Sequence, residues 1–253
     1  MDEVKVTIED GVSIIAINRP ESRNAVNLAV ARGIAAAVDE LDARDDLRVG
    51  ILTGNGGGFC AGMDLKAFLR GELGRIEGRG FAGFTERPPR KPTIAAVEGY
   101  ALAGGLELAL ACDLIVASRT ARLGLPEVKR GLVANAGGLV RLPRQAPMRV
   151  ALELVLTGEA MSADALAGHG LINRVVEPGT ALEAALGMAR AIAANAPMAI
   201  RVSKEVITRS QDWAADDLFR LQREITAPVF ASSDAREGAA AFAEKRKPAW
   251  TGK

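Results

Sequence analysis

The first half of the chain alternates short strand-like and helix-like segments. Polar and apolar residues alternate from Val4 to Ile8, Asp10-Gly11 supplies a turn, and Val12 to Ile17 is apolar, which predicts a hairpin. The same patterns predict further strands over 48–53, 92–97, 114–117 and 122–125, and helices over 27–43 and 104–112. Strands that alternate with helices favour an α/β layered fold.

From residue 149 on, helical spacing dominates. It predicts helices over 149–156, 162–167, 180–195, 198–210, 212–226 and 233–245. Ser162 stands where an N-cap is expected, and Pro197 and Pro228 are expected to punctuate the helical tail. We therefore expect an α/β core over residues 1–195 and a helical region over 196–253.

The stretch over residues 70–91 has the least regular pattern. It holds five glycines and several arginines, and prolines break the chain near its end, so we interpret it as a mobile surface loop. Gly78, Gly80 and Gly83 match G-x-G-x-x-G, but no strand precedes them and no helix follows, which argues against a dinucleotide site. The glycines over 54–58 lack the Lys-Ser/Thr of a phosphate loop.

Composition and charge exclude several classes of function. The 253 residues include 32 basic and 31 acidic side chains, and a net charge of +1 gives no field to hold nucleic acid or an anionic membrane. No apolar run reaches membrane-spanning length, and from the acidic start MDEVKVTIEDG we expect no signal peptide. Two cysteines form no disulfide framework, so we expect a cytoplasmic protein.

The single histidine and the two cysteines point to no metal or nucleophile. One histidine excludes zinc sites built on several, and His169 lies in Gly-His-Gly with no orienting acid visible, so we interpret it as structural. Cys60 and Cys112 have apolar neighbours and are expected to be buried, inert thiols. No metal is expected.

The segment from Gly99 to Asp113 carries the first chemical signal. A helix that starts near Gly104 would offer unpaired N–H groups and positive potential in its first turn, which suits an anion or oxyanion. The helical neighbours of Glu107 are all apolar, so its carboxyl is expected to face inward. A buried carboxyl has a raised pKa and is typical of a functional site.

Two further segments are compatible with a site or with plain structure. Glu127 follows Leu-Gly-Leu-Pro at the end of a predicted strand, where a solvated glutamate is equally expected. The glycine-rich exit over 57–66 could present a second N–H at Met63, or could be only a tight strand-to-helix turn.

Together these segments resemble the enoyl-CoA hydratase/isomerase (crotonase) superfamily along nearly the whole chain. The matching motifs, in order, are Asn18-Arg19-Pro20, Arg23-Asn24-Ala25, Phe59–Lys66, Gly99–Asp113, Leu123–Glu127, Leu156–Glu159, Gly170–Ile172 and Phe242–Arg246. One such motif is weak, whereas the ordered set is specific.

The resemblance implies a crotonase-like spiral of ββα units with a helical C-terminal region that mediates assembly into trimers or dimers of trimers. The ligand would be an acyl-CoA thioester, with no separate cofactor. The N–H groups of Met63 and Gly104 would form the oxyanion hole. Glu107 would deprotonate the water that adds at Cβ, and Glu127 would deliver a proton to Cα. The resemblance therefore implies an enoyl-CoA hydratase.

The resemblance also implies which residues contact CoA. They are Arg23, Ala25, Ala61, Met63, Asp64, Leu65, Lys66 and Gly104, together with Lys245, which would meet a CoA phosphate across a subunit boundary or be only a solvated helix end.

The chain departs from the family pattern near the acyl group. Ala103 replaces the first glycine of a triplet, which we take as a mild change, and Ala134-Asn135 replaces a Pro-Gly. The Gly80–Glu86 segment and the C-terminus resemble the carnitinyl-CoA dehydratase branch, whose cationic substrate needs an aromatic or acidic neighbour that the sequence does not place.

Two alternatives therefore remain open at this point. A crotonase-fold dehydratase, isomerase or hydrolase could act on a specialised CoA ester such as crotonobetainyl-CoA. A non-catalytic acyl-CoA or RNA binding module is the other class, and the near-zero net charge and the two retained glutamates argue against it.

Overall fold

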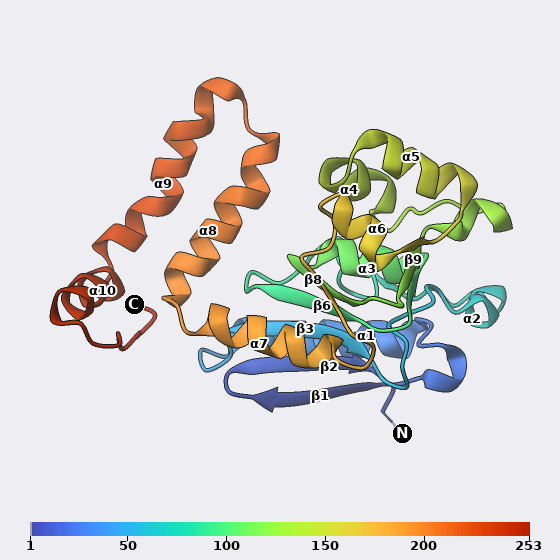
Figure 1. Ribbon diagram of the computed structural model, residues 1–253, viewed down its shortest axis with the longest axis horizontal. Coiled ribbons are helices and arrows are strands. Elements are labelled where there is room, and N and C mark those ends of the chain that lie inside the picture. Colours follow the sequence, from blue (N-terminus) through green and yellow to red (C-terminus); the bar gives the residue numbers. More distant parts are fainter. Residues whose placement is uncertain (1) are drawn as a thin grey trace.

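The computed structural model describes residues 2–253 and shows an α/β molecule built around a six-stranded sheet (Figure 1). β1 and β2 form an antiparallel hairpin, and every other pair of neighbours is parallel. In sheet order the strands are β1 (Val4–Glu9), β2 (Val12–Ile17), β3 (Val49–Gly54), β6 (Thr93–Val97), β8 (Leu114–Ser118) and β11 (Arg174–Val176). The predicted class and the predicted hairpin are confirmed.

Helices cover both faces of this sheet, because its central strands are apolar on both sides. One face, which includes Ile15, packs against α1 (Leu28–Ala43) and α3 (Gly104–Ala111). The opposite face, which includes Ile14, packs against α7 (Ala181–Ala193). The alternation of side chains along each strand thus divides the core into two layers.

A second sheet has three strands, two of which directly follow strands of the first sheet. Its order is β10-β9-β7, with β7 (Tyr100–Leu102), β9 (Arg122–Gly124) and β10 (Met161–Ser162). The pair β6 and β7 leads into α3, and the pair β8 and β9 leads into the 3₁₀ helix η2 (Pro126–Arg130). This recurrence is the spiral of ββα units that the resemblance implies.

Residues 70–91 differ from the predicted surface loop. β4 (Arg75–Ile76) and β5 (Gly80–Phe81) form a small hairpin, and Ala82 and Phe84 are buried in the core. The interpretation as an irregular solvated segment is wrong there, because two apolar side chains gain enough burial to fold the glycine-rich chain onto α1.

Five further helices complete the part that surrounds the sheets. They are η1 (Pro20–Ser22), α2 (Leu65–Leu69), α4 (Gly138–Gln145), α5 (Met148–Thr157) and α6 (Ala163–Gly168). Ser162 caps α6 as predicted, since its hydroxyl accepts a hydrogen bond from the Ala165 N–H at 3.2 Å. The patterns did not predict α4, whose positions carry few apolar residues.

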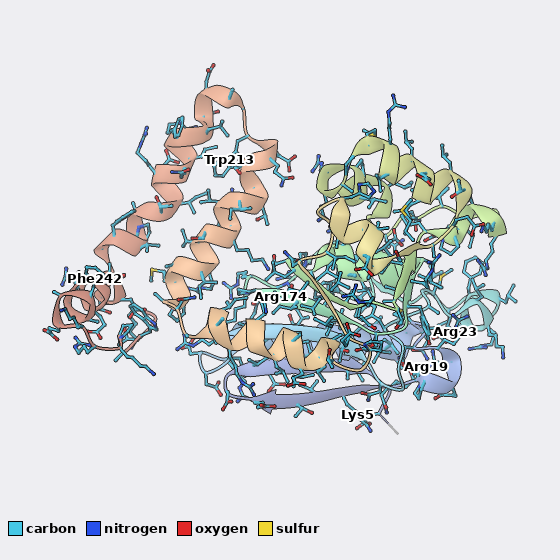
Figure 2. The ribbon with its side chains drawn as sticks, in the orientation of Figure 1. Lys5, Arg19, Arg23, Arg174, Trp213 and Phe242 are labelled. Atoms are coloured by element: carbon cyan, nitrogen blue, oxygen red, sulfur yellow. The ribbon has the colours of Figure 1, made fainter. Side chains whose placement is uncertain are left out.

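The chain ends in three helices that extend away from the sheets (Figure 1, orange to red), and Figure 2 shows Trp213 and Phe242 on this projecting part. They are α8 (Pro197–Arg209), α9 (Leu218–Ala231) and α10 (Ser233–Glu244), with the short turns η3 (Ser210–Asp212) and η4 (Ala215–Asp217) between the first two. No residue of α8 or α9 is fully buried. The change from sheet-packed to projecting helices falls after α7, and the division at residue 195 stays a prediction.

Two details of this region correct the sequence patterns. The helix expected from residue 212 begins only at Leu218, and Pro228 lies inside α9 rather than at its boundary. A proline removes one N–H donor and crowds one carbonyl, which the exposed helix tolerates here. Within residues 2–253, no helix has the length and apolar character needed to cross a membrane.

Candidate active site

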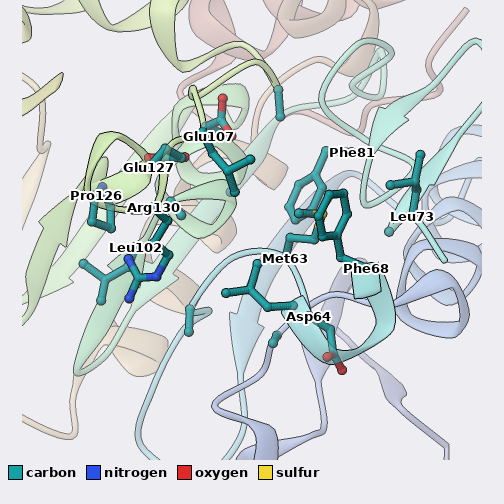
Figure 3. Close-up of a pocket in the computed structure, with 18 of the residues that line it drawn as sticks. Met63, Asp64, Phe68, Leu73, Phe81, Leu102, Glu107, Pro126, Glu127 and Arg130 are labelled. Carbon is teal, nitrogen blue, oxygen red and sulfur yellow. The ribbon is translucent and has the colours of Figure 1, made fainter. Parts of the chain in front are cut away.

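A cavity of about 710 Å³ opens between the start of α3, helix α2 and the segment from η2 to α4 (Figure 3). This volume lies within the range of roughly 300–1,000 Å³ found for small-molecule sites. Segments distant in sequence line it, namely 21–25, 61–75, 102–107 and 126–136, together with Phe81 and Glu86.

Two of these segments are joined by close backbone contact. The Leu102 N–H donates to the Cys60 carbonyl at 3.0 Å, and Cys60 pairs with Ala101 as an isolated bridge. A Cβ on Gly105 would lie 2.1 Å from the same carbonyl oxygen, so only glycine allows this approach. The glycine-rich exit after β3 is therefore held against the first turn of α3.

The N–H groups of Met63 and Gly104 lie on these joined segments. Both residues line the cavity, and within residues 2–253 neither N–H has a hydrogen-bond acceptor. A Cβ on Gly62 would lie 3.1 Å from the Gly104 nitrogen, which shows how near the two segments are. Gly104 begins α3, so the positive end of the helix dipole faces the same place.

Ala103, directly before α3, has a strained backbone. Its φ of 53° and ψ of −128° belong to a region that residues other than glycine rarely adopt. The substitution for a family glycine, taken as mild from sequence, therefore carries a conformational cost of about 1–3 kcal/mol. The strained residue directly precedes the Gly104 N–H.

Glu107 points into the cavity from α3, as its apolar neighbours predict, and is 3% exposed. Its Oε1 accepts a hydrogen bond from the Gly138 N–H at 2.8 Å. Burial raises the pKa of this carboxyl to about 7, with a further increase from nearby Glu127, while the Gly138 and Ala136 N–H groups and the Arg141 charge act in the opposite direction.

Glu127 lies in the first turn of η2, at the same end of the cavity as Glu107 (Figure 3). Glu127 is 9% exposed, and its buried Oε2 has no hydrogen-bond partner among residues 2–253. Burial raises its pKa, and the charge of Arg130 partly offsets this. A buried, unpartnered carboxyl oxygen is costly, which favours a role toward a bound molecule.

Most residues expected to contact CoA lie together along the cavity. These are Arg23, Ala25, Ala61, Met63, Asp64, Leu65, Lys66 and Gly104. The Asp64 carboxylate is already engaged, because it caps α2 and forms an ion pair with Arg19 at 3.0 Å. Lys245 lies at the C-terminal end of α10, away from the cavity of its own chain.

The structure also brings residues to the cavity that the sequence patterns did not single out. Phe68 and Phe81 form an aromatic wall near Met63 (Figure 3), and Glu86 lines the cavity as well. The Phe81 ring lies within 2.6 Å of the position that a Cβ on Gly104 would take. In the sequence, the pair Gly137-Gly138 could have indicated that this backbone lies close to another group, which the structure shows to be Glu107.

The residues interpreted as structural lie outside the cavity. His169 caps the C-terminal end of α6 and is exposed, whereas Cys60 and Cys112 are buried free thiols, and burial raises the pKa of each to about 12. Across residues 2–253, no cluster of three histidine, cysteine, aspartate or glutamate side chains could hold a metal ion.

Replacing Ala103 with glycine should stabilise the chain by about 1 kcal/mol, because glycine adopts the positive φ without a Cβ clash. Urea unfolding measures the change. Ala165→Gly, in the exposed middle of α6, is the matched control and should lower the free energy of unfolding by about 1 kcal/mol. Equal loss of stability in both variants would contradict the strain at Ala103.

Glu107→Gln should stabilise the fold above neutral pH. The folded-state pKa is raised from 4.5 to about 7, so below 4.5 the group contributes no difference between the folded and unfolded states. As pH rises to 7 the unfolded chain loses the proton first, and the wild type loses up to about 3 kcal/mol that the amide does not. Urea unfolding from pH 4 to 8 tests this, with exposed Glu153→Gln as control; parallel curves for wild type and Glu107→Gln would refute it.

Comparison with known proteins places the chain in a family. The profile of the enoyl-CoA hydratase/isomerase family matches residues 7–253. The mevalonyl-coenzyme A hydratase sidH of Aspergillus fumigatus is 40% identical over 94% of this chain and 91% of its own length. A carnitinyl-CoA dehydratase of Salmonella arizonae is 39% identical over 99% of both chains. The crystal structure of the enoyl-CoA hydratase EchA1 from Mycobacterium marinum is 58% identical, with a TM-score of 0.98 over 100% of both chains. This chain belongs to the enoyl-CoA hydratase/isomerase family.

Proposed function

We propose that the chain is an enoyl-CoA hydratase, which reversibly adds water across the double bond of a 2-enoyl-CoA thioester. One observation carries the proposal: the cavity joins two buried carboxyls, Glu107 and Glu127, to the two unpaired N–H groups of Met63 and Gly104. The family and the hydratases among the similar proteins support the same reaction.

The N–H groups of Met63 and Gly104 would bind the thioester oxygen. When water adds at Cβ, negative charge moves to this oxygen and an enolate forms. Two N–H donors and the N-terminal end of α3 favour that charge more than the neutral thioester. Donors placed in this way contribute about 3–4 kcal/mol each to the transition state in comparable sites.

The two glutamates would divide the proton transfers. Glu107, as carboxylate, takes a proton from the water whose oxygen bonds to Cβ. Glu127, as carboxylic acid, gives its proton to Cα when the enolate collapses, so one water is added in total. A pKa of about 7 lets Glu107 act as a base near neutral pH, and burial favours the protonated form of Glu127.

The CoA portion would lie along the rim formed by the expected contact residues. Arg23 and Lys66 are exposed cations there and suit its phosphates, while Ala25, Ala61 and Leu65 leave room for the chain between. CoA is part of the substrate, so we propose no separate cofactor. Lys245 would serve a neighbouring subunit, because it is remote from its own cavity.

Assembly into trimers, or dimers of trimers, is proposed on the same basis. The projecting helices α8 and α9 have no fully buried residue, and Phe219 and Phe230 are 70% and 80% exposed. Apolar surface of this kind gains free energy by burial against another copy. We retain the cytoplasm as the proposed location, since both cysteines are unpaired thiols.

The decisive experiment follows the loss of the ultraviolet absorbance of crotonyl-CoA. Wild type should remove it and form a product heavier by one water, whereas an isomerase leaves the mass unchanged. Glu107→Gln and Glu127→Gln should each lower kcat by about 10²–10⁴-fold, since each removes a proton carrier. Exposed Glu153→Gln is the control, and all variants should bind the unreactive butyryl-CoA. Full activity in either glutamine variant would remove its assigned role.

A second candidate is a hydro-lyase that acts on a CoA ester with a cationic acyl group, such as crotonobetainyl-CoA. The observation that favours it is the wall formed by Phe68 and Phe81 with Glu86 nearby, because aromatic faces and a carboxylate attract a quaternary ammonium. A relative named carnitinyl-CoA dehydratase matches nearly the whole chain.

Glu86→Gln separates the two candidates. If the acyl group is cationic, the variant should raise KM for crotonobetainyl-CoA about 5–30-fold, equivalent to 1–2 kcal/mol, and leave KM for crotonyl-CoA unchanged. Glu21→Gln, which alters a carboxylate elsewhere on the cavity lining, is the control. No turnover of crotonobetainyl-CoA, or equal effects on both substrates, would reject this candidate.

A further inference from the structure

Arg141 on α4 is a partly buried arginine without an acidic partner. Within residues 2–253 its guanidinium forms no ion pair, and its only side-chain hydrogen bond is donated from Nη2 to the Thr85 carbonyl. A Cβ on Gly137 would lie 2.1 Å from its Nη1, so the guanidinium folds back against the first turn of its own helix. Burying a cation without an anionic partner costs desolvation free energy, which suggests that the position of Arg141 serves the site.

On the Thr85 side, this contact is connected to the backbone around Gly104. The Thr85 hydroxyl accepts a hydrogen bond from the Phe81 N–H at 3.0 Å, which closes the turn that follows β5. The Phe81 ring in turn rests against Gly104, where it occupies the space that a side chain would need. Arg141 therefore connects α4, through this turn, to the wall beside the Gly104 N–H.

On the α4 side, the contact is connected to Glu107 through Gly138. Gly138, one helical turn before Arg141, donates the hydrogen bond that holds Oε1 of Glu107. The Arg141 charge lowers the pKa of Glu107, opposite to the effect of Glu127. Burial lowers the pKa of Arg141 itself, and the charges of Glu107 and Glu86 act in the opposite direction.

We propose that Arg141 is a positioning residue of the reaction proposed above, whose guanidinium fastens the Phe81–Thr85 turn to the start of α4. It thereby sets the spacing between the Glu107 carboxylate and the Gly104 N–H. Its positive charge also favours the carboxylate form of Glu107. Both effects act through other residues, so Arg141 itself does not touch substrate.

Three variants test the proposal. Arg141→Met removes the charge and the donor but keeps the length, Arg141→Lys keeps the charge without the fork, and Arg144→Met changes an exposed arginine of the same helix. Arg141→Met should lower kcat on crotonyl-CoA about 10–100-fold with KM changed less than about threefold, as expected for a misplaced base. Arg141→Lys should recover part of kcat, and Arg144→Met should behave as wild type.

The pH profile separates positioning from simple damage to the fold. Glu107 must be deprotonated to act, so the rising limb of kcat should move to higher pH in Arg141→Met and stay in place in Arg141→Lys. If Arg141→Met leaves both kcat and the pH of the rising limb unchanged, the proposal is overturned. The proposal is also overturned if Arg141→Met and Arg141→Lys both lose butyryl-CoA binding to the same extent as they lose kcat.

A measurement without turnover keeps this inference apart from the proposed function. The ¹³C resonance of the Glu107 carboxyl can be titrated in wild type and in Arg141→Met. A higher titration midpoint in the variant supports the inference even if crotonyl-CoA is not hydrated, in which case only the proposed function fails. Identical midpoints would overturn it.

Discussion

The site depends on the close approach of the Cys60 segment to the first turn of α3. The contact is possible only because Gly105 has no side chain, and it is fixed by the hydrogen bond from Leu102 to the Cys60 carbonyl. It brings the N–H groups of Met63 and Gly104 to one wall although forty residues separate them in sequence. Every other part of the cavity is arranged around this wall, and the strained backbone of Ala103 is a local cost of keeping it.

Burial of charge is the second feature that governs the site. Glu107 and Glu127 are removed from water and, within residues 2–253, neither forms an ion pair; backbone N–H groups and the charges of Arg141 and Arg130 partly offset the effect of burial. Burial therefore raises both pKa values toward the range where acid–base catalysis operates. The same burial lowers the stability of the folded state at neutral pH. The raised pKa values that suit acid–base catalysis therefore destabilise the fold.

Particular residues show how far sequence reasoning reached. The inward position of Glu107 was predictable, because every helical neighbour is apolar. The local pattern around Glu127 did not distinguish it from a solvated glutamate; only the family resemblance singled it out, and the structure shows that it is buried with an unpartnered oxygen. The turn that carries Phe81 was missed, since glycine-rich sequence gives no periodic pattern even when its few apolar residues are buried. The start of α9 was misplaced for a related reason, because helical spacing does not register short 3₁₀ turns.

The sequence by itself determined the α/β class, most of the main strands and helices, the resemblance to the family and, through that resemblance, the two carboxyls, because these depend on local periodicity and on motifs of adjacent residues. Only the tertiary structure decided which groups meet at the site. It places Phe68 and Phe81 on the cavity wall, and behind the lining it joins Gly138 to Glu107 and Arg141 to Thr85. Such contacts join residues dozens of positions apart. They are set by how elements pack across the core, and no local pattern along the chain encodes that packing.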